Sequence, residues 1–347
     1  MKAFTLHQRG PDGCRIGEAP VPRRRGGNVL VRMLAASLNR VDLYMRDNGA
    51  GITHDLPLIM GVDGVGEIVE APEGSSLTPG TRVLLYPYEF CGRCPHCTAG
   101  DQPLCLTARI PGEHRDGTLA EFIALPEPSV VPISPQTDPL AAAALGVAYL
   151  TAWRMVFGKV PVKPGQTVLV QGAGGGVAFA AGQLARMAGA RVIASTTGTD
   201  KIARCADEGF EVVDYARDPL NQILSLTGGH GADLVIDNVG EATWKTSLRA
   251  ARRGGAIVTC GATTGAHPSA DLQRLFVRQL SLHGSTMGSL AEFRTLISCF
   301  ERKAFTVPVD SVFDLDHTRD ALARLDHPER FGKVVIRIAA PNASGAL

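Results

Sequence analysis

A glycine cluster between two apolar segments constrains the fold of this chain more than any other stretch. Thr167–Val170 is a short apolar run typical of a buried parallel strand, and four glycines follow it between positions 172 and 176. Apolar residues then recur at helical spacing before a second apolar run begins at Arg191. Strand, glycine turn, helix and strand in this order form the first unit of a dinucleotide-binding fold.

Glycine suits this turn because a pyrophosphate binds against the unpaired backbone N–H groups at the start of a helix, where side chains would hold it away. Val177 occupies the last position of the usual glycine fingerprint, so the match is a looser variant in which Ala178 is the small residue. An ordinary tight turn before a helix is the alternative interpretation. The residues predicted to bind the cofactor phosphates are Gly172, Gly174, Gly175, Gly176 and Val177.

Composition narrows the class of protein further. The chain has 347 residues, 45% of them hydrophobic, and a formal net charge of +1. These values predict two domains with large cores, and a near-neutral chain gives no reason to expect nucleic acid or an anionic membrane as a partner. No apolar run reaches the ~20 residues needed to span a bilayer, and the N-terminus lacks the long apolar core of a signal peptide. We therefore expect a cytoplasmic protein.

Strand and helix signals divide the chain into three parts. Residues 1–130 contain mostly short strand patterns separated by Gly and Pro, whereas residues 131–302 alternate strands with helices. Within the second part we expect a long alanine-rich helix over 141–159 and then six strands of a doubly wound parallel sheet. Residues 303–347 add strand, helix and strand patterns that return to the first domain. The predicted fold class is α/β with two domains.

Four cysteines crowd into one short segment. Cys91, Cys94, Cys97 and Cys105 form a C-x2-C-x2-C-x7-C pattern, whose thiolates can close a tetrahedron around one Zn²⁺. A complete four-sulfur shell leaves no open coordination position, so this site is expected to stabilise the fold rather than to catalyse. His96 is an alternative ligand, and reduced cysteines without metal are the alternative to the site as a whole. The remaining cysteines are isolated and are interpreted as packing residues: Cys14, Cys205, Cys260 and Cys299.

Taken together, a β-rich first part, a Cys₄ lobe and a glycine-rich second part resemble the medium-chain dehydrogenase/reductase superfamily, which includes zinc alcohol dehydrogenases and quinone oxidoreductases. The cysteine spacing and the segment Pro57–Gly66 are the specific marks of this resemblance, which extends to about residue 338. It implies a GroES-like catalytic domain over 1–130 with a zinc lobe at 91–105, a Rossmann domain over 131–302, and a return to the catalytic domain over 303–347.

Three positions depart from the zinc alcohol dehydrogenases of that superfamily. Those enzymes carry a catalytic Cys where this chain has Asn39, and a His where it has Val62, followed here by Asp63. Their third zinc ligand falls within Ala141–Gly146. Amide, valine and alanine side chains do not supply a zinc Lewis-acid site. The resemblance therefore implies a retained structural zinc and a lost catalytic zinc.

Two other segments, Ser37–Arg46 and Val147–Trp153, resemble zinc-independent quinone and enone reductases of the same superfamily. In those relatives, residues that match Asn39 and Tyr44 line the cleft for the nicotinamide and the substrate. Both are therefore expected to be catalytic residues here, although Asn39 also suits a helix N-cap and Tyr44 a half-buried packing position. Such reductases usually lack a Cys₄ lobe, so this chain combines features of both groups.

The end of the second Rossmann strand favours NADP(H) over NAD(H). NAD-specific sites place an acidic residue there to bind the ribose hydroxyls, whereas Ala194–Gly198 contains none. A carboxylate at this place would repel a 2′-phosphate, whereas the hydroxyls of Ser195 and Thr196 would not, and Lys201 can supply positive charge. Asp200 offers a way to bind NAD(H) instead. The resemblance and the expected strand ends add further cofactor contacts at Thr151, Tyr215, Asn238, Gly240, Gly261, Gly284 and Ser285.

These inferences predict an NADPH-dependent reductase of quinones or α,β-unsaturated carbonyls that works without a catalytic zinc. A conjugated acceptor spreads negative charge after hydride addition, and Tyr44 could donate a hydrogen bond or a proton to the developing enolate oxygen. Two alternatives stay open, a zinc alcohol dehydrogenase with atypical ligands and an NADPH-binding structural or sensor protein. The last Rossmann strand, near Leu282, is a plausible edge for pairing in a homodimer or homotetramer.

Overall fold

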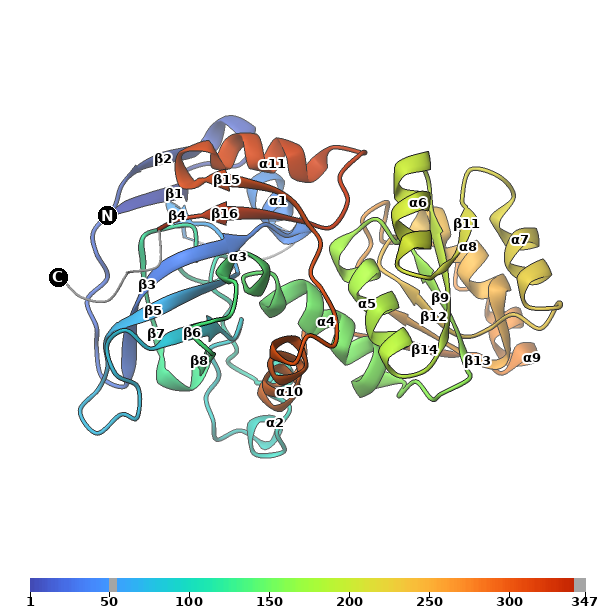
Figure 1. Cartoon of the computed structure of the whole chain (residues 1–347), viewed down its shortest axis with the longest axis horizontal. Helices are drawn as coiled ribbons and strands as arrows, with labels where there is room; N and C mark the ends of the chain where they lie inside the picture. Colours follow the sequence, from blue (N-terminus) through green and yellow to red (C-terminus); the bar gives the residue numbers. More distant parts are fainter. Residues whose placement is uncertain (50–54, 340–347) are drawn as a thin grey trace. The chain divides into compact units, whose positions relative to one another are not determined.

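The computed structural model describes residues 1–49 and 55–339. It divides into two compact units, Ala148–Gly288 and the remainder, in which Met1–Val147 is joined by the described residues from Ser289 on (Figure 1). The sequence places these changes at 130/131 and 302/303 instead. Helix α10 (Leu290–Glu301) explains part of the difference, because Glu301 Oε1 accepts a hydrogen bond from the backbone N–H of Ser134 at 2.7 Å. No helix in the described ranges is long and apolar enough to cross a membrane.

The first unit is built on β-sheets, as the Gly- and Pro-separated strand patterns predict. A seven-stranded sheet runs in the order β15-β16-β3-β5-β6-β8 with β7 also paired to β3, and a three-stranded sheet runs β2-β1-β4. The strands are β1 (Lys2–Leu6), β2 (Cys14–Glu18), β3 (Asn28–Ser37), β4 (Leu58–Ile59), β5 (Asp63–Glu70), β6 (Arg82–Leu85), β7 (Phe122–Pro126), β8 (Val130–Pro132), β15 (Val309–Asp314) and β16 (Lys333–Arg337).

Two apolar clusters fill the first unit. One lies under helices α1 (Arg40–Asp47) and α11 (Thr318–Asp326), and the other is formed by inward residues of β3, β5, β6 and β7. Strand β16 pairs antiparallel with β3, so the last described strand joins the sheet that β3 begins. Burial of these large side chains supplies the main favourable free energy of folding, at about 25 cal/mol per Å² of apolar surface.

The second unit is a six-stranded parallel sheet in the order β11-β10-β9-β12-β13-β14. This order reverses direction next to β9, which is the arrangement of a doubly wound dinucleotide-binding domain. The predicted α/β fold class, with a GroES-like domain and a Rossmann domain, is thereby confirmed. The elements are β9 (Thr167–Gln171), α5 (Gly176–Met187), β10 (Arg191–Thr196), α6 (Thr199–Asp207), β11 (Glu211–Asp214), α7 (Pro219–Leu226), β12 (Ala232–Asp237), α8 (Glu241–Ala250), β13 (Ala251–Thr259), α9 (Leu272–Arg278) and β14 (Ser281–Gly284).

The long helix expected over 141–159 is wrong as a single α-helix. The chain forms α3 (Pro139–Ala142), a π-helical turn (Leu145–Tyr149), α4 (Leu150–Trp153) and a second π-helical turn (Arg154–Lys159). The reason is tertiary, because the N–H of Val147 donates to Asp63 Oδ2 at 3.2 Å. A Cβ at Gly146 would also lie only 2.8 Å from Asp63 Cβ. The first irregular turn is thus fitted around the Asp63 side chain.

Candidate functional site

The glycine turn after β9 has the geometry that a phosphate site requires. Gly172 has a φ of 70°, which L side chains rarely adopt, and a Cβ there would lie 2.8 Å from Val239 Cγ2. Gly175 is the N-cap of α5 and brings no side chain to the helix start, and Gly176 and Val177 begin the helix. The backbone N–H groups and the dipole of a twelve-residue helix are therefore open to an anion.

A second turn, after β12, lies beside the glycine turn. Asp237 is fully buried, and its Oδ1 accepts hydrogen bonds from the N–H groups of Val239 at 2.9 Å and Gly240 at 3.0 Å. Asn238 Oδ1 is buried and has no hydrogen-bond partner among the described residues. It lies 3.8 Å from the position that a Cβ on Gly172 would take. Sequence analysis missed Asp237; its place at a strand end before a glycine was the available signal.

The strands bring most predicted cofactor residues to one edge of the sheet. Because β9, β12, β13 and β14 are parallel neighbours, their carboxyl ends meet, which places Gly172, Gly240, Gly261 and Gly284 along one line. Gly261 lies close to Asn238, since a Cβ on Gly261 would be 3.1 Å from the Asn238 carbonyl oxygen. Ser285 continues this edge, and its N–H donates to the Thr259 carbonyl at 2.8 Å. Thr151 is buried in α4.

The end of β10 carries the residues predicted to bind the adenosine part of the cofactor. Ser195 is buried, and its hydroxyl has no exposed surface and no hydrogen-bond partner among the described residues. Thr196 is 6% exposed, and its carbonyl accepts the N–H of Tyr215 at 2.8 Å. The Tyr215 hydroxyl donates to the Ala242 carbonyl at 2.5 Å. Lys201 lies beside the glycine turn, because a Cβ on Gly174 would be 2.7 Å from Lys201 Cδ.

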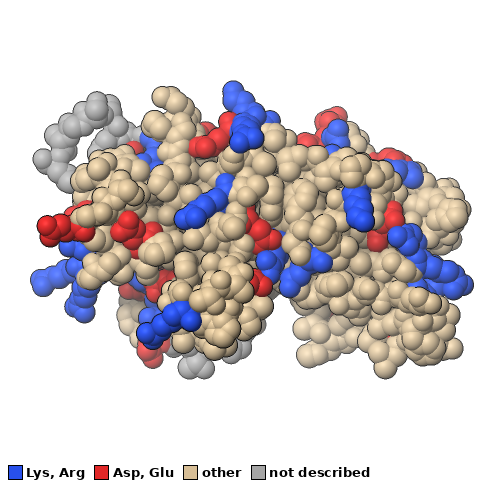
Figure 2. All heavy atoms as spheres, turned by 90° about the horizontal axis from the view of Figure 1, so that it is seen from below, with Lys and Arg blue, Asp and Glu red and all other residues tan. Residues whose placement is uncertain are grey.

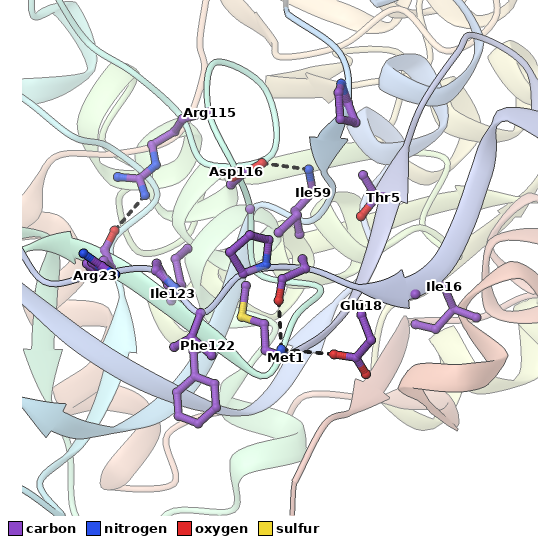
Figure 3. Close-up of a pocket in the computed structure, with 18 of the residues that line it drawn as sticks. Met1, Thr5, Ile16, Glu18, Arg23, Ile59, Arg115, Asp116, Phe122 and Ile123 are labelled. Carbon is purple, nitrogen blue, oxygen red and sulfur yellow. Dashed lines mark hydrogen bonds and ion pairs between the residues drawn. The ribbon is translucent and has the colours of Figure 1, made fainter.

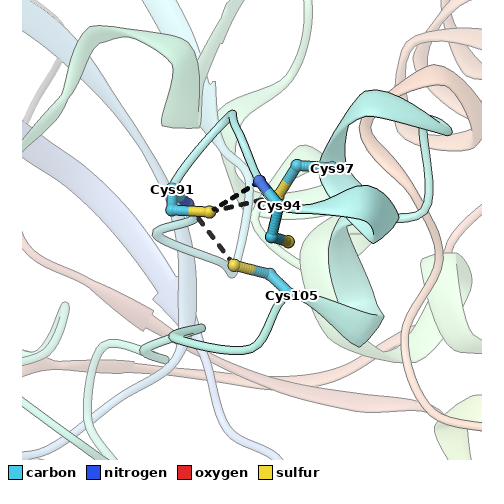
Figure 4. A group of neighbouring side chains, drawn as sticks. All are labelled: Cys91, Cys94, Cys97 and Cys105. Carbon is cyan, nitrogen blue, oxygen red and sulfur yellow. Dashed lines mark hydrogen bonds between the residues drawn. The ribbon is translucent and has the colours of Figure 1, made fainter.

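The four predicted zinc ligands converge in the first unit (Figure 4). One ligand atom from each of Cys91, Cys94, Cys97 and Cys105 lies within 4.8 Å of the others, and within the described ranges this is the one group of at least three such side chains. The sulfurs of Cys91 and Cys97 are 3.9 Å apart, close to the ~3.8 Å edge of a tetrahedron with Zn–S bonds of ~2.3 Å. The residues present therefore fit a zinc ion.

Backbone N–H groups favour the thiolate form of Cys91 and Cys94, whereas burial raises the pKa of the Cys97 thiol to about 12. The N–H of Cys94 donates to Cys91 Sγ at 3.3 Å, and the N–H of Cys91 donates to Cys105 Sγ at 3.4 Å. Hydrogen bonds from the backbone of Arg93 and Cys94 lower the pKa of the Cys91 thiol to about 6. Deprotonated sulfur is the form that binds metal, so the loop is arranged to hold a zinc ion that cross-links its two ends.

A buried polar cluster surrounds Asn39, the first of the three positions at which the resemblance implies a missing catalytic-zinc ligand. Lys333, 3% exposed, donates from Nζ to Asn39 Oδ1 at 2.6 Å and to the Leu38 carbonyl at 2.7 Å. Asn39 Nδ2 donates to the Ser37 carbonyl at 3.2 Å, so the amide is engaged at both ends. Asn39 is the residue before α1, as its predicted N-cap role requires. Lys333 was missed because it lies 294 residues further along the chain.

Two carboxyls surround this ammonium. Asp63 Oδ1 accepts the Ser37 hydroxyl at 2.8 Å, and Asp42 Oδ2 accepts the N–H of Asn39 at 2.7 Å. Burial raises the pKa of the Asp42 carboxyl to about 7 and also raises the pKa of Asp63. Burial lowers the pKa of the Lys333 ammonium to about 8, against the attraction of Asp63 and Asp42. The charge of Lys333 therefore affects the pKa of both carboxyls, and their charges affect the pKa of Lys333.

Tyr44, the other predicted catalytic residue, lies in the middle of α1. Its side chain is half-buried and packs against the apolar cluster under that helix, and its carbonyl accepts the N–H of Asn48. This environment is that of the packing role considered for it, while the partial exposure leaves part of the ring accessible. Segment 50–54, which follows α1, lies outside the described residues.

A separate cavity of about 910 Å³ opens in the first unit between β1, β2 and β7 (Figure 3). None of the predicted site residues lines it. Two of its charged groups have partners: Glu18 binds the Met1 ammonium at 3.2 Å, and Arg115 donates to the Ala124 carbonyl at 2.7 Å. Basic and acidic side chains are interspersed on the face shown in Figure 2.

Family models match both parts of the chain. The Alcohol dehydrogenase GroES-like domain matches residues 25–135, and the Zinc-binding dehydrogenase model matches residues 176–302. The fold and the family models thus define an oxidoreductase with a GroES-like and a Rossmann domain. The chain belongs to the medium-chain dehydrogenase/reductase superfamily, which confirms the resemblance; its Cys₄ cluster is not the catalytic zinc site.

Several relatives match nearly the whole chain. A zinc-type alcohol dehydrogenase-like protein of Schizosaccharomyces pombe is 30% identical over 96% of this chain and 99% of its own. A crystal structure of an NAD-dependent alcohol dehydrogenase is 36% identical, with a TM-score of 0.94 over 98% of this chain and 100% of its own. A crotonyl-CoA carboxylase/reductase, AntE, determined with NADP, is 25% identical, with a TM-score of 0.88 over 97% of this chain and 95% of its own.

The cysteine cluster predicts one zinc ion per chain. Replacement Cys94→Ser should remove the zinc and lower the melting temperature, because a structural metal contributes its binding free energy to folding. Metal analysis and thermal unfolding measure both effects. Cys299→Ser, at an isolated and partly exposed cysteine, is the matched control and should change neither. Zero or two zinc ions per unmutated chain would contradict the prediction.

The ammonium of Lys333 should stabilise the first unit in a pH-dependent way. We expect Lys333→Met to lower the free energy of unfolding by about 3–5 kcal/mol at neutral pH, because it leaves buried carboxylates uncompensated. A carboxyl with a raised folded-state pKa binds extra protons when folded, so stability falls as pH rises through the window between its unfolded and folded values. The decrease in the free energy of unfolding caused by Lys333→Met should therefore be larger at about pH 7.5 than at about pH 5, since Asp42 has a pKa of about 7.

Urea unfolding at both pH values measures this effect. Lys163→Met, at an exposed lysine whose ammonium has no partner in the described ranges, is the control and should leave the free energy of unfolding within about 0.5 kcal/mol. A deficit of equal size at the two pH values would mean that Lys333 acts through packing rather than through charge.

Proposed function

We propose that this oxidoreductase reduces quinones or α,β-unsaturated carbonyl compounds with NADPH and without a catalytic zinc. One observation carries the proposal. Asn39, at the position of the first zinc ligand in the zinc alcohol dehydrogenases, directs its oxygen to the Lys333 ammonium at 2.6 Å. Because this oxygen already accepts a hydrogen bond from an ammonium, it is not available as a zinc ligand. Val62, at the second position, has no atom that can bind a metal.

Interconversion of simple alcohols and carbonyls benefits from a Lewis acid, because the oxygen carries a full negative charge at the transition state. A conjugated acceptor needs less help, since hydride addition at its β-carbon spreads the charge over the carbonyl. When bound, the nicotinamide supplies the hydride, and the protein orients the two partners. Crotonyl-CoA, which appears in the name of one structural neighbour, carries a conjugated acyl group of this kind.

NADPH is proposed as the reductant because β10 ends without a carboxylate. Its exposed continuation is Thr197 and Gly198, and the first acidic side chain, Asp200, lies in the first turn of α6. Lys201 lies beside the glycine turn, where its ammonium is within reach of a phosphate. The name of the 36% identical structure specifies NAD, so NADH is the competing reductant in the test.

The proposed assembly is a homodimer or homotetramer built on the edge of the second unit. Strand β14 ends the six-stranded sheet, and Leu282 on it is 40% exposed. An unpaired strand edge offers backbone N–H and C=O groups to a second copy. Sedimentation at several protein concentrations tests this assembly, and a monomer at all of them would exclude it.

The cofactor preference gives one prediction. NADPH should bind more tightly than NADH, and Lys201→Ala should narrow the gap by about one to two decades, because a charged hydrogen bond contributes roughly 1.5–3 kcal/mol. Fluorescence titration of both cofactors measures the affinities. Asp200→Ala distinguishes the alternative, since it should weaken NADH selectively if that carboxylate binds the ribose. Equal affinities in the unmutated protein would contradict the assignment.

The reaction gives the next prediction. With NADPH deuterated at C4, an enone should be reduced to a saturated ketone with deuterium on the β-carbon, and turnover should not require a metal outside the Cys₄ site. Tyr44→Phe should lower kcat by about tenfold, less than the 10²–10³ typical of a donor aimed at developing charge, because water can replace the hydroxyl. Product analysis by NMR decides the outcome. Deuterium on a carbinol carbon, with the double bond retained, would indicate carbonyl reduction and favour an alcohol dehydrogenase.

A further inference from the structure

The loop over 110–118 carries a buried carboxyl that the sites above do not use. Glu113 is 7% exposed, and its carboxyl makes no hydrogen bond or ion pair with the described residues. Its oxygens are nevertheless not completely enclosed and keep some exposed surface. A buried carboxyl without a partner loses hydration and gains no hydrogen bond in return, which costs stability. Stability alone therefore does not explain why an acid stands at this position.

Close backbone packing fixes this loop beside Gly61 and Val62. The N–H of Thr118 donates to the Gly61 carbonyl at 3.0 Å. A Cβ on Gly112 or Gly117 would lie 2.3 Å or 2.1 Å from the Gly61 carbonyl oxygen, so only glycine permits this approach. Glu113 follows Gly112 directly, and it is therefore held next to the second position at which the zinc ligand is missing.

Electrostatics connect Glu113 to the first such position as well. The negative charge of Glu113 is the smallest of the effects that raise the pKa of Asp42, after burial and the charge of Asp63. Asp42 binds the N–H of Asn39, and its other oxygen, Oδ1, is sealed without a partner. Glu113 thus lies on a loop that packs against Gly61, next to Val62, and its charge acts on the Asp42 carboxyl that binds Asn39.

We propose that Glu113 is the catalytic acid that completes the reduction, an inference that rests on the proposed reaction with a conjugated acceptor. Hydride addition at the β-carbon breaks the C=C π bond and leaves an enolate. The O–H bond of Glu113 then breaks, and its proton forms a C–H bond at the α-carbon. The remaining carboxylate recovers a proton from water, so the net change is the addition of one hydride and one proton to the substrate.

The proton is available where the reaction needs it. Burial raises the pKa of the Glu113 carboxyl to about 7, so the group carries a proton near neutral pH and can release it there. Asp42, Asp63 and Lys333 titrate in the adjoining cluster, and His114 lies next to Glu113 on the loop. Burial lowers the pKa of His114, and its Nδ1 already accepts the N–H of Ile110, so it is not a competing acid.

Replacement Glu113→Gln keeps the size of the side chain and removes the acid. We expect turnover of an enone with NADPH to fall about 10²-fold or more, as for a lost general acid, with NADPH affinity and melting temperature unchanged. Glu73→Gln, at an exposed glutamate of the same unit, is the matched control and should keep full activity. Turnover of E113Q within about threefold of the unmutated enzyme would overturn the proposal, since general acids contribute far more.

Isotope effects separate a chemical role from a structural one. In E113Q the protonation step should become limiting, so the solvent deuterium effect on kcat rises while the effect of C4-deuterated NADPH falls towards unity. In the unmutated enzyme, solvent deuterium should enter one face of the α-carbon, and E113Q should lose this selectivity. A slow E113Q enzyme with unchanged isotope effects and selectivity would show that Glu113 only shapes the site, and the proposal would be wrong.

Infrared spectroscopy of the protein without cofactor gives a readout besides activity. The carbonyl stretch of a protonated carboxylic acid should be present near neutral pH in the unmutated protein and reduced in E113Q. Spectra that are identical for the two proteins would overturn the proposal. If the unmutated enzyme instead labels a carbinol carbon, the proposed function fails separately, and the same isotope comparison then decides whether Glu113 protonates the carbonyl oxygen.

Discussion

A buried carboxylate, Asp63, is the constraint around which the first unit is arranged. Taking this group out of water is costly unless hydrogen bonds replace its hydration. The chain supplies them from two directions, from the hydroxyl and N–H of Ser37 on β3 and from the N–H of Val147 in the π-helical turn. The Asp63 carbonyl accepts the Thr118 hydroxyl at 2.9 Å. One residue thus joins β3, β5, the 110–118 loop and the irregular helix.

Sequence reasoning succeeded for elements that local patterns determine, and it failed where Asp63 changes the local structure. The Rossmann strands were predictable because each is a short apolar run followed by glycine or a polar turn, a local pattern that tertiary contacts do not override. The break in the helix over 141–159 was not predictable. Alanine-rich sequence favours an α-helix, and only the position of Asp63, some eighty residues earlier, makes Gly146 and Val147 adopt the π-helical turn.

The candidate site shows the same division. The cysteine ligands lie within fifteen residues of each other, so their spacing alone predicted the cluster. Lys333 and Glu113 left no such signal, since each is a single charged residue. Pairing of β16 with β3 brings Lys333 to Asn39, and glycine packing against Gly61 brings the loop of Glu113 to Val62. Ser195 was predicted to bind the cofactor from its position at a strand end, and that position does not reveal that its hydroxyl is buried.

The lost zinc ligands and the buried polar cluster have a common physical logic. A metal site in this place would bring positive charge beside Asp63 and Asp42, and the carboxylates would offset its desolvation. Here the positive charge is an ammonium that is covalently part of β16, so it needs no metal but is fixed at Asn39 Oδ1 and the Leu38 carbonyl. An ammonium held in this way balances the carboxylates without an open position for a substrate oxygen. In the proposed reaction, stabilisation of the developing charge must therefore come from conjugation within the substrate and from a proton donor at the accessible side of the cluster.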